Sequence, residues 1–145
     1  MQGLIQRVSQ AHVVVDGKVI GQINKGIVLL LGVEKDDDFA AADKLLNKVS
    51  GYRIFADADG KMNLSLKDTT GDLLVVSQFT LAANTNKGLR PSFSSAADPE
   101  LGEQLYNYFV EQAKETLSHV QTGQFGADMA VHLVNDGPVT FQLTV

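Results

Sequence analysis

The chain of 145 residues is 44% hydrophobic and 20% charged, and its formal net charge is −5 at pH 7. A chain of this length and composition can bury one core, so we expect a single domain over residues 1–145. The sequence has no cysteine, no apolar run long enough to span a bilayer and no signal-peptide pattern, which excludes disulfides and thiolate chemistry and predicts a cytoplasmic protein.

The first third of the chain has the patterns of β-strands. Leu4 to Val8 is typical of a short strand. Val13 to Val15 and Lys18 to Ile20 flank Asp16-Gly17, a dipeptide typical of the two-residue turn in a hairpin. Gly26 to Val33 is a continuous apolar run, as expected for a strand that is buried on both faces.

Two helices are predicted from their caps and their apolar spacing. Asp36 to Asp38 offers an N-cap for the first helix, which we expect to end near Gly51. Asp98 caps the second helix, with Pro99 at its first position and Glu100 in its first turn. The residues that recur at helical spacing, and that we expect to be buried, are Ala42, Leu45, Leu46 and Val49 in the first helix and Leu101, Leu105, Tyr108 and Phe109 in the second.

The rest of the chain predicts further strands and one long loop. Tyr52 to Phe55 and Leu73 to Leu81 are predicted strands. Ala82 to Ala97 has no clear periodicity, and loops of this length are uncommon and often functional. The tail, residues 120–145, alternates like antiparallel strands and is interrupted at residues 135–138. Strands outnumber helices, so we expect one α/β domain in which two helices cover part of a sheet.

The histidines do not predict a metal site. His12, His119 and His132 are scattered, without the i, i+4 spacing of a helical metal site. His12 and His132 lie in apparent strands, where an ordinary structural role is the better interpretation. Carboxylates do not cluster convincingly either, so we expect neither a metal ion nor a cofactor.

The acidic net charge argues mildly against a nucleic-acid substrate, because nucleic-acid binders usually carry a basic surface. Only the local patch must be positive, however. Five basic residues could supply such a patch if the fold gathers them; otherwise they are solvated surface charges. They are Lys48, Arg53, Lys61, Lys87 and Arg90.

Ser77-Gln78-Phe79-Thr80 places polar side chains in the second half of a predicted buried strand. Free backbone N–H groups there could form an oxyanion hole for ester cleavage. The simpler interpretation is that these polar residues satisfy the end of a strand. A serine-hydrolase mechanism fits poorly, because Ser77 lacks the Gly-x-Ser-x-Gly pattern and no histidine is placed by sequence as its base.

Asn135-Asp136-Gly137-Pro138 is the second segment that interrupts a strand pattern. These residues form turns, so a hairpin connection is the simplest interpretation. A cis peptide at Gly137-Pro138 is the alternative, although cis peptides are uncommon even before proline. Glycine at this position would let the backbone approach a ligand closely.

Seven segments, in order, resemble the D-aminoacyl-tRNA deacylase family over essentially the whole chain. They are LIQRV (4–8), GIVLLLGVEKDDD (26–38), GYRIFADADGKMNLS (51–65), LLVVSQFTLAA (73–83), RPSF (90–93), QTGQFGADM (121–129) and NDGPVTF (135–141). Each segment alone is modest evidence, but seven in the same order are highly specific. Neither main motif departs from the family's pattern.

The resemblance implies a fold and the location of an active site. The implied fold is a layered β/β/α sandwich of mostly antiparallel strands, with two main helices on one side. The implied assembly is a homodimer with two active sites at the subunit interface. Ser77, Gln78 and Thr80, with Phe79 between them, are expected to line the pocket for the 3′-terminal adenosine and the aminoacyl group of tRNA.

The resemblance also implies how the enzyme reads chirality. Gly137-Pro138 is expected to be a cis-proline motif that reaches into the partner's pocket, held in orientation by Arg7. Met129 and the loop around Ala96 are expected to complete the pocket wall. A rigid backbone wall can collide with an L side chain and accept the D arrangement, which is selection by exclusion. Glycine has no side chain, so glycyl-tRNA is an expected additional substrate.

The expected reaction needs no enzymatic nucleophile. The aminoacyl ester is already activated, and the neighbouring ribose hydroxyl can assist water, so positioning and the N–H groups of Phe79 and Thr80 can suffice. We therefore favour substrate-assisted hydrolysis over a covalent intermediate on Thr80. Two alternatives are a non-catalytic RNA-binding module that senses a tRNA end, and a hydrolase of small esters or amides that uses Ser77 or Thr80 covalently.

Overall fold

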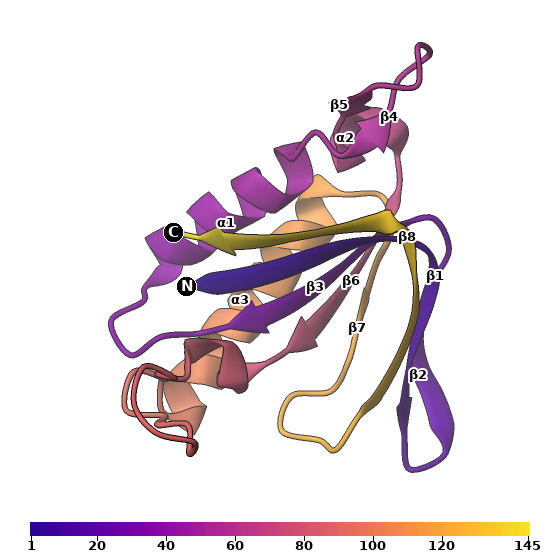
Figure 1. The fold of residues 1–145 in the computed structure, drawn as a ribbon. Helices are drawn as coiled ribbons and strands as arrows, with labels where there is room; N and C mark the ends of the chain where they lie inside the picture. The colour runs from indigo at the N-terminus through magenta and orange to yellow at the C-terminus, as the bar shows by residue number, and fades with distance from the viewer.

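The computed structural model describes the whole chain, Met1 to Val145, as eight strands, three α-helices and one short 3-10 helix (Figure 1). The strands are β1 (Gln2–Val15), β2 (Lys18–Ile23), β3 (Gly26–Gly32), β4 (Phe55–Ala56), β5 (Met62–Leu64), β6 (Asp72–Ser77), β7 (Val120–Thr122) and β8 (Ala130–Thr144). The helices are α1 (Phe39–Gly51), α2 (Leu66–Thr69), the 3-10 helix η1 (Phe79–Ala82) and α3 (Pro99–Thr116).

Six strands form one sheet in the order β2-β1-β3-β6-β7, with β8 paired to β1. β1 is antiparallel to β2, β3 and β8, whereas the β3–β6 and β6–β7 pairs are parallel. The first half of β1 pairs with β3 and its second half with β2, while β8 follows its other edge. The α/β class and the mostly antiparallel strands are therefore confirmed. The layered sandwich is not confirmed as two separate β layers, because these six strands belong to a single sheet.

The two main helices cover one face of this sheet. α1 and α3 lie side by side in Figure 1, and both contribute buried residues to the larger hydrophobic core, which also contains Ile5, Leu29 and Leu31 of the sheet. Val28 and other residues of the opposite face belong to a second, smaller core. β3 is thus buried on both faces, as its apolar run predicts. None of the helices has the length and apolar character that crossing a bilayer requires.

The predicted caps are confirmed, and so are the predicted buried residues except Leu101 and Tyr108 of α3, which are only partly buried. The Asp38 carboxylate accepts a hydrogen bond from the N–H of Ala41, and the Asp98 carboxylate accepts one from Leu101. The Asp16-Gly17 turn also forms, and both residues have positive φ, as the hairpin turn requires. The buried residues of these helices are Ala42, Leu45, Leu46, Val49 and Ser50 in α1, and Gly102, Leu105, Tyr106, Phe109, Val110 and Ala113 in α3.

Several strand boundaries differ from the prediction. β1 is one strand and not two short ones: the exposed Ser9 and Gln10 interrupt the apolar pattern, but pairing with β8 continues across two register shifts. Tyr52 to Phe55 is wrong as a strand, because only Phe55 belongs to one, the two-residue β4 that pairs with β5. β6 ends at Ser77, and the polar end predicted as strand forms η1.

The predicted interruption at residues 135–138 does not end the strand, since β8 continues through it as one strand of 15 residues, but pairing with β1 skips residues 136–139 at a register shift. The Gly137-Pro138 peptide within it is cis. The side chain of Asn135 spans this step: its Nδ2 donates to Thr140 Oγ1 (2.9 Å), and its Oδ1 accepts from the N–H of Val139 (3.3 Å). These hydrogen bonds hold turn-forming residues inside a strand.

Candidate active site

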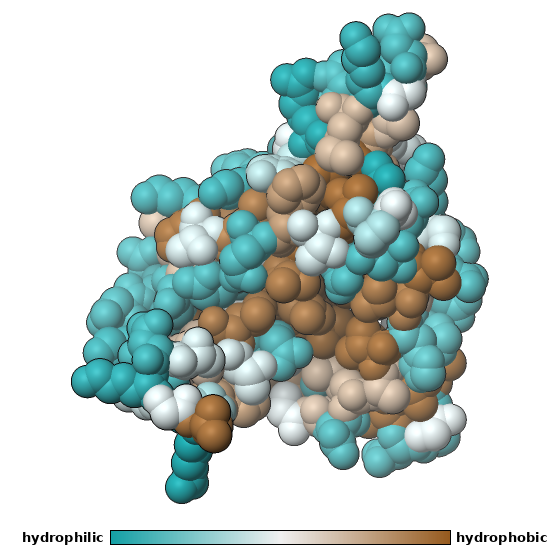
Figure 2. Space-filling model, viewed as in Figure 1, coloured by the Kyte–Doolittle hydropathy of each residue, from teal (hydrophilic) through white to brown (hydrophobic).

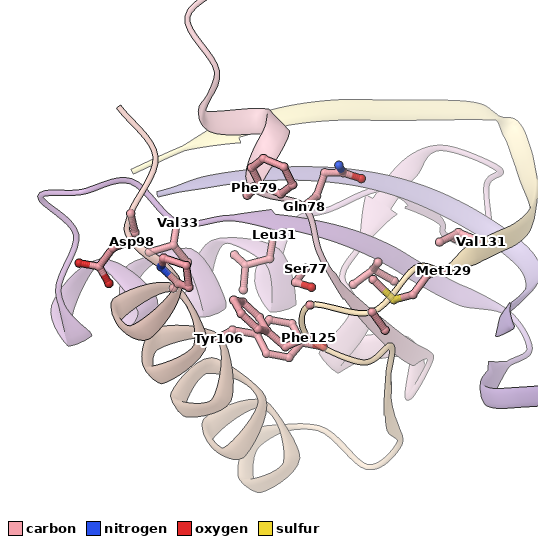
Figure 3. A pocket seen from close by; sticks show the side chains of 16 residues that line it. Leu31, Val33, Ser77, Gln78, Phe79, Asp98, Tyr106, Phe125, Met129 and Val131 are labelled. Carbon is pink, nitrogen blue, oxygen red and sulfur yellow. The ribbon is translucent and has the colours of Figure 1, made fainter. Parts of the chain in front are cut away.

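A cavity of about 490 Å³ opens at the carboxyl end of β6 (Figure 3). In Figure 2, apolar residues gather in the middle of the face that carries β3 and β6. The cavity is mainly apolar, so it suits a ligand with aromatic or aliphatic surface. Its lining residues are Leu31, Val33, Val76, Ser77, Gln78, Phe79, Ala97, Asp98, Pro99, Gly102, Tyr106, Phe125, Gly126, Ala127, Met129 and Val131.

The polar edge of this cavity is built by the end of a parallel strand pair. Ser77 pairs with Leu31 of β3, and the N–H of Gln78 donates to the carbonyl of Leu31 (2.8 Å), which fixes the point where the chain leaves the sheet. The following turn, η1, starts with Phe79 and Thr80, whose N–H groups have no partner among the hydrogen bonds of this turn. Two adjacent free N–H groups at a cavity edge can stabilise a developing oxyanion.

The structure brings three of the four predicted pocket residues to the cavity: Ser77, Gln78 and Phe79. The side chain of Thr80 is exposed and does not line it. Its Oγ1 instead accepts a hydrogen bond from Gln78 Nε2, so the hydroxyl is engaged with a neighbouring side chain. This geometry does not favour Thr80 as a nucleophile.

The side of the cavity opposite Phe79 is formed by Tyr106 and Phe125, with ring centroids 5.7 Å apart, and Ser77 lies between the two sides (Figure 3). The Tyr106 hydroxyl donates to the carbonyl oxygen of Val75 (2.9 Å), and burial raises the pKa of Tyr106 to about 12. Tyr106 was not predicted as a site residue. Its position three residues before Phe109 places it on the same helical stripe, so the spacing predicts that Tyr106 is buried but gives no sign that it lines a cavity.

The two residues expected to complete the wall behave differently. Met129 lines the cavity, and its sulfur lies 3.4 Å from the N–H nitrogen of Gln124. Ala96 does not line it, although the next residue, Ala97, does. Ala96 instead forms an isolated β-bridge with Glu34, which fixes the loop that borders the cavity.

Gly137 and Pro138 are exposed and lie outside this cavity of their own chain. Arg7 also lies outside it, but it contacts the segment directly before the glycine. Its Nε donates to the carbonyl of Asp136 (3.2 Å) and lies 3.4 Å from the Asp136 carboxylate. Its Nη1 donates to the carbonyl of Ile54 (2.7 Å). Arg7 is therefore bonded to the residue directly before Gly137-Pro138.

The histidines and acidic residues form no recognisable metal site. No group of three His, Asp or Glu side chains is placed to hold an ion. His12 and His132 do lie in strands, β1 and β8, and their rings stack with centroids 4.4 Å apart. The sequence did not predict this pairing, because it depends on the register of two strands far apart in the chain.

The five basic residues considered for a positive patch do not gather in one place. Lys48 is near the end of α1, and Arg53 and Lys61 are beside β4 and β5. Lys87 and Arg90 are in the loop between η1 and α3, at the opposite end of the molecule (Figure 1). Only this last pair lies in a segment that borders the cavity.

Comparisons with known proteins agree with these features. The family model described as D-Tyr-tRNA(Tyr) deacylase matches residues 4–144. The chain is 66% identical to a D-aminoacyl-tRNA deacylase of Pseudoalteromonas translucida and 59% identical to one of Escherichia coli O81, in both cases over 100% of each chain.

Two solved structures have the same fold. One is the c-Myc DNA Unwinding Element Binding Protein, with a TM-score of 0.96 and 39% identity, covering 100% of this chain and 99% of that one. The other is described as a probable eukaryotic D-amino acid tRNA deacylase, with a TM-score of 0.86, 18% identity and coverage of 99% and 98%. The second likeness shows the fold alone.

Proposed function

The chain belongs to the D-Tyr-tRNA(Tyr) deacylase family, and we propose that it hydrolyses the ester bond that joins a D-amino acid to the 3′ end of tRNA. The observation that carries this proposal is the cavity at the end of β6, where the family's Ser77-Gln78-Phe79 segment meets a mainly apolar chamber. Full-length relatives named D-aminoacyl-tRNA deacylase support the same activity. The products are free tRNA and the D-amino acid, so the enzyme removes errors of chirality from translation in the cytoplasm.

The site residues have distinct roles in this reaction. The 3′-terminal adenosine occupies the cavity between Phe79 and the Tyr106–Phe125 pair, and Met129 forms part of its wall. The N–H groups of Phe79 and Thr80 stabilise the oxyanion that forms when the ester carbonyl is attacked. Ser77 and Gln78 provide polar contacts at the same edge.

The attacking water is assisted by the substrate's own ribose hydroxyl. The Thr80 hydroxyl is held by the Gln78 side chain, and the chain places no histidine in the cavity lining, so a covalent mechanism has no evident base. The enzyme contributes positioning and two N–H dipoles. Because an aminoacyl ester is already reactive, these contributions are sufficient.

Selection against L-amino acids comes from a second subunit. Gly137-Pro138 is exposed on its own chain, and the cavity is open on one side. The exposed segment of one subunit could therefore close the open side of the cavity in another. In the proposed homodimer, the Gly137-Pro138 segment of one subunit stands at the edge of the partner's cavity, held by Arg7. An L side chain would collide with this backbone, whereas a D side chain points away from it. Glycyl-tRNA, which has no side chain to reject, is accepted as well.

The decisive experiment is parallel deacylation of one tRNA charged with the D or the L form of the same amino acid. Purified protein without added metal should release the D-amino acid and leave the L-aminoacyl-tRNA intact. Binding without release would favour a non-catalytic RNA-binding module, and equal rates would contradict selection by exclusion. Cleavage of model esters with trapping of an acylated Ser77 or Thr80 would favour a covalent hydrolase.

A further inference from the structure

Two exposed aromatic rings stand together at the edge of the cavity. Phe79 lines the cavity yet leaves 61% of its surface exposed, and Phe93 is 42% exposed. Their ring centroids are 5.2 Å apart, with planes inclined by 51°. Large aromatic residues are usually buried, so an exposed pair that continues the apolar wall of a cavity suggests a ligand that extends beyond it.

Phe93 belongs to the loop of residues 83–97, which is positively charged in an acidic protein. The loop contains Lys87 and Arg90 and no Asp or Glu, whereas the whole chain has a net charge of −5. Both cations are exposed, and neither takes part in an ion pair or a side-chain hydrogen bond. The nearest acid along the chain, Asp98, accepts a hydrogen bond from the N–H of Leu101 at the start of α3.

The loop of residues 83–97 is held in place next to the cavity. The N–H of Asn84 donates to the carbonyl of Ser92 (2.8 Å), and the N–H of Ser92 donates back to Asn84 (3.1 Å), which closes the loop. At its base, Ser95 Oγ donates to the carbonyl of Ala82, and the N–H of Ala97 donates to the carbonyl of Val33 (3.0 Å). The aromatic pair and the two cations are therefore carried by a fixed structure.

We propose that this loop and the Phe79–Phe93 pair bind the single-stranded nucleotides immediately 5′ of the terminal adenosine. Bases stack on the two rings, and Lys87 and Arg90 contact the phosphates. This combination of aromatic faces and free cations is how proteins bind single strands without reading sequence. The inference rests on the proposed function, because it takes the cavity as the site of the terminal adenosine.

A second exposed aromatic pair in the chain provides the contrast. Phe39, 45% exposed, packs edge-on against Tyr108, with centroids 4.7 Å apart on the outer side of α1 and α3. The Tyr108 hydroxyl donates to the Asp43 carboxylate, so this pair lies beside negative charge, and neither of its rings lines the cavity. Exposed aromatic rings alone do not make a nucleic-acid site, and of these two pairs it is Phe79–Phe93 that has cations on the loop of one of its rings.

The test compares two substrates, D-aminoacyl-tRNA and the D-aminoacyl ester of adenosine alone. Phe93→Ala should raise KM for the tRNA by about 10-fold, as expected for loss of one stacking surface, and should leave hydrolysis of the adenosine ester unchanged. Phe93→Tyr, which keeps an aromatic ring, should restore the wild-type KM for D-aminoacyl-tRNA. Phe39→Ala is the matched control and should change neither substrate.

The proposed phosphate contacts of the two cations are tested with the double variant Lys87→Ala/Arg90→Ala. Because each phosphate contact to a single strand contributes about 0.7 to the slope of log affinity against log salt, this variant should lower the slope by about 1.4. Lys44→Ala/Lys114→Ala removes the same charge from α1 and α3 and should leave the slope unchanged. Equal losses on both substrates, or no effect of the loop variants, would overturn the inference. A wild-type protein that cleaves neither substrate would instead refute the proposed function.

Discussion

Arg7 and Asp136 are joined at two points, because Arg7 Nε lies 3.2 Å from the Asp136 carbonyl oxygen and 3.4 Å from its carboxylate. The same guanidinium donates to the carbonyl of Ile54. A planar guanidinium with several fixed donors holds geometry better than a single cation. Arg7 thus connects the segment before Gly137 to the chain before β4, and this connection orients the proposed chirality-reading backbone.

Replacement of Arg7 should therefore affect selectivity more than turnover. We expect Arg7→Ala to raise the rate on L-aminoacyl-tRNA relative to the D form by about 10-fold or more, because a segment that moves no longer excludes the L side chain. Arg7→Lys should recover this only in part, since one ammonium cannot make all the contacts. The ratio of D to L deacylation rates measures the effect. An unchanged ratio in a folded Arg7→Ala protein would contradict the positioning role.

Gly137 has a φ of +129°, and a Cβ at this position would lie 2.7 Å from Val139 Cγ2 and 3.1 Å from Arg7 Nη2. We expect Gly137→Ala to destabilise the fold by about 1–3 kcal/mol, through backbone strain and this overlap, and to weaken rejection of L substrates. Gly51→Ala is the control, because nothing lies within 4 Å of its added Cβ. Urea unfolding of both variants gives the comparison, and equal midpoints would argue against strain at Gly137.

Thr80→Ala should retain most of the wild-type activity on D-aminoacyl-tRNA. The variant keeps the backbone N–H that is proposed to stabilise the oxyanion, and loses only a hydroxyl that accepts from Gln78 Nε2. The rate constant measured in single-turnover assays should fall by less than about 10-fold. Complete loss of hydrolysis, with normal folding and tRNA binding, would support a covalent role for Thr80.

Local patterns were sufficient where local physics decides the structure. The Asp38 and Asp98 caps and the apolar run of β3 were predicted from the sequence, because capping and burial depend on residues near one another in the chain. The cavity edge at Ser77 was expected from the resemblance to the family, because the polar residues alone were explained as well by the end of a strand.

The predictions failed where a distant partner decides the structure. The continuation of β8 on both sides of Gly137-Pro138 depends on pairing with β1, from the opposite end of the chain, at Asn135 and again at Thr140. The side of the cavity opposite Phe79 is formed by Tyr106 of α3 and Phe125 of the segment after β7, and no spacing along the chain reveals that contact. The separation of Lys87 and Lys61 at opposite ends of the molecule likewise depends on how the whole chain folds.

Gly102 provides a way to fill the cavity without touching its polar edge. It lies on α3 facing Phe125, whose Cζ would be 3.4 Å from an added Cβ. We expect Gly102→Leu to occupy the space assigned to the adenosine and to reduce kcat/KM by at least about 100-fold with the fold retained. Asn107→Leu adds the same side chain on the exposed side of α3 and should remain active. Full activity of Gly102→Leu would place the substrate elsewhere.

Tyr106 should make the stability of the protein sensitive to alkaline pH. Burial raises its pKa to about 12 from 10.0. Between these values the unfolded chain loses the phenolic proton while the folded chain keeps it, so unfolding becomes more favourable as pH rises. The contribution of Tyr106 is therefore fully present below about pH 10 and is lost as pH approaches 12.

Tyr106→Phe tests this directly. At pH 8 the variant should be less stable by about 1 kcal/mol, because the hydrogen bond to the Val75 carbonyl (2.9 Å) is lost. The deficit stays small because that carbonyl also accepts from the N–H of Gly123 (3.0 Å). Above pH 10 the wild type should lose stability more steeply than the variant, so that the two unfolding free energies converge. Parallel curves from pH 8 to 11, measured by urea denaturation, would show that the phenol ionises equally in both states.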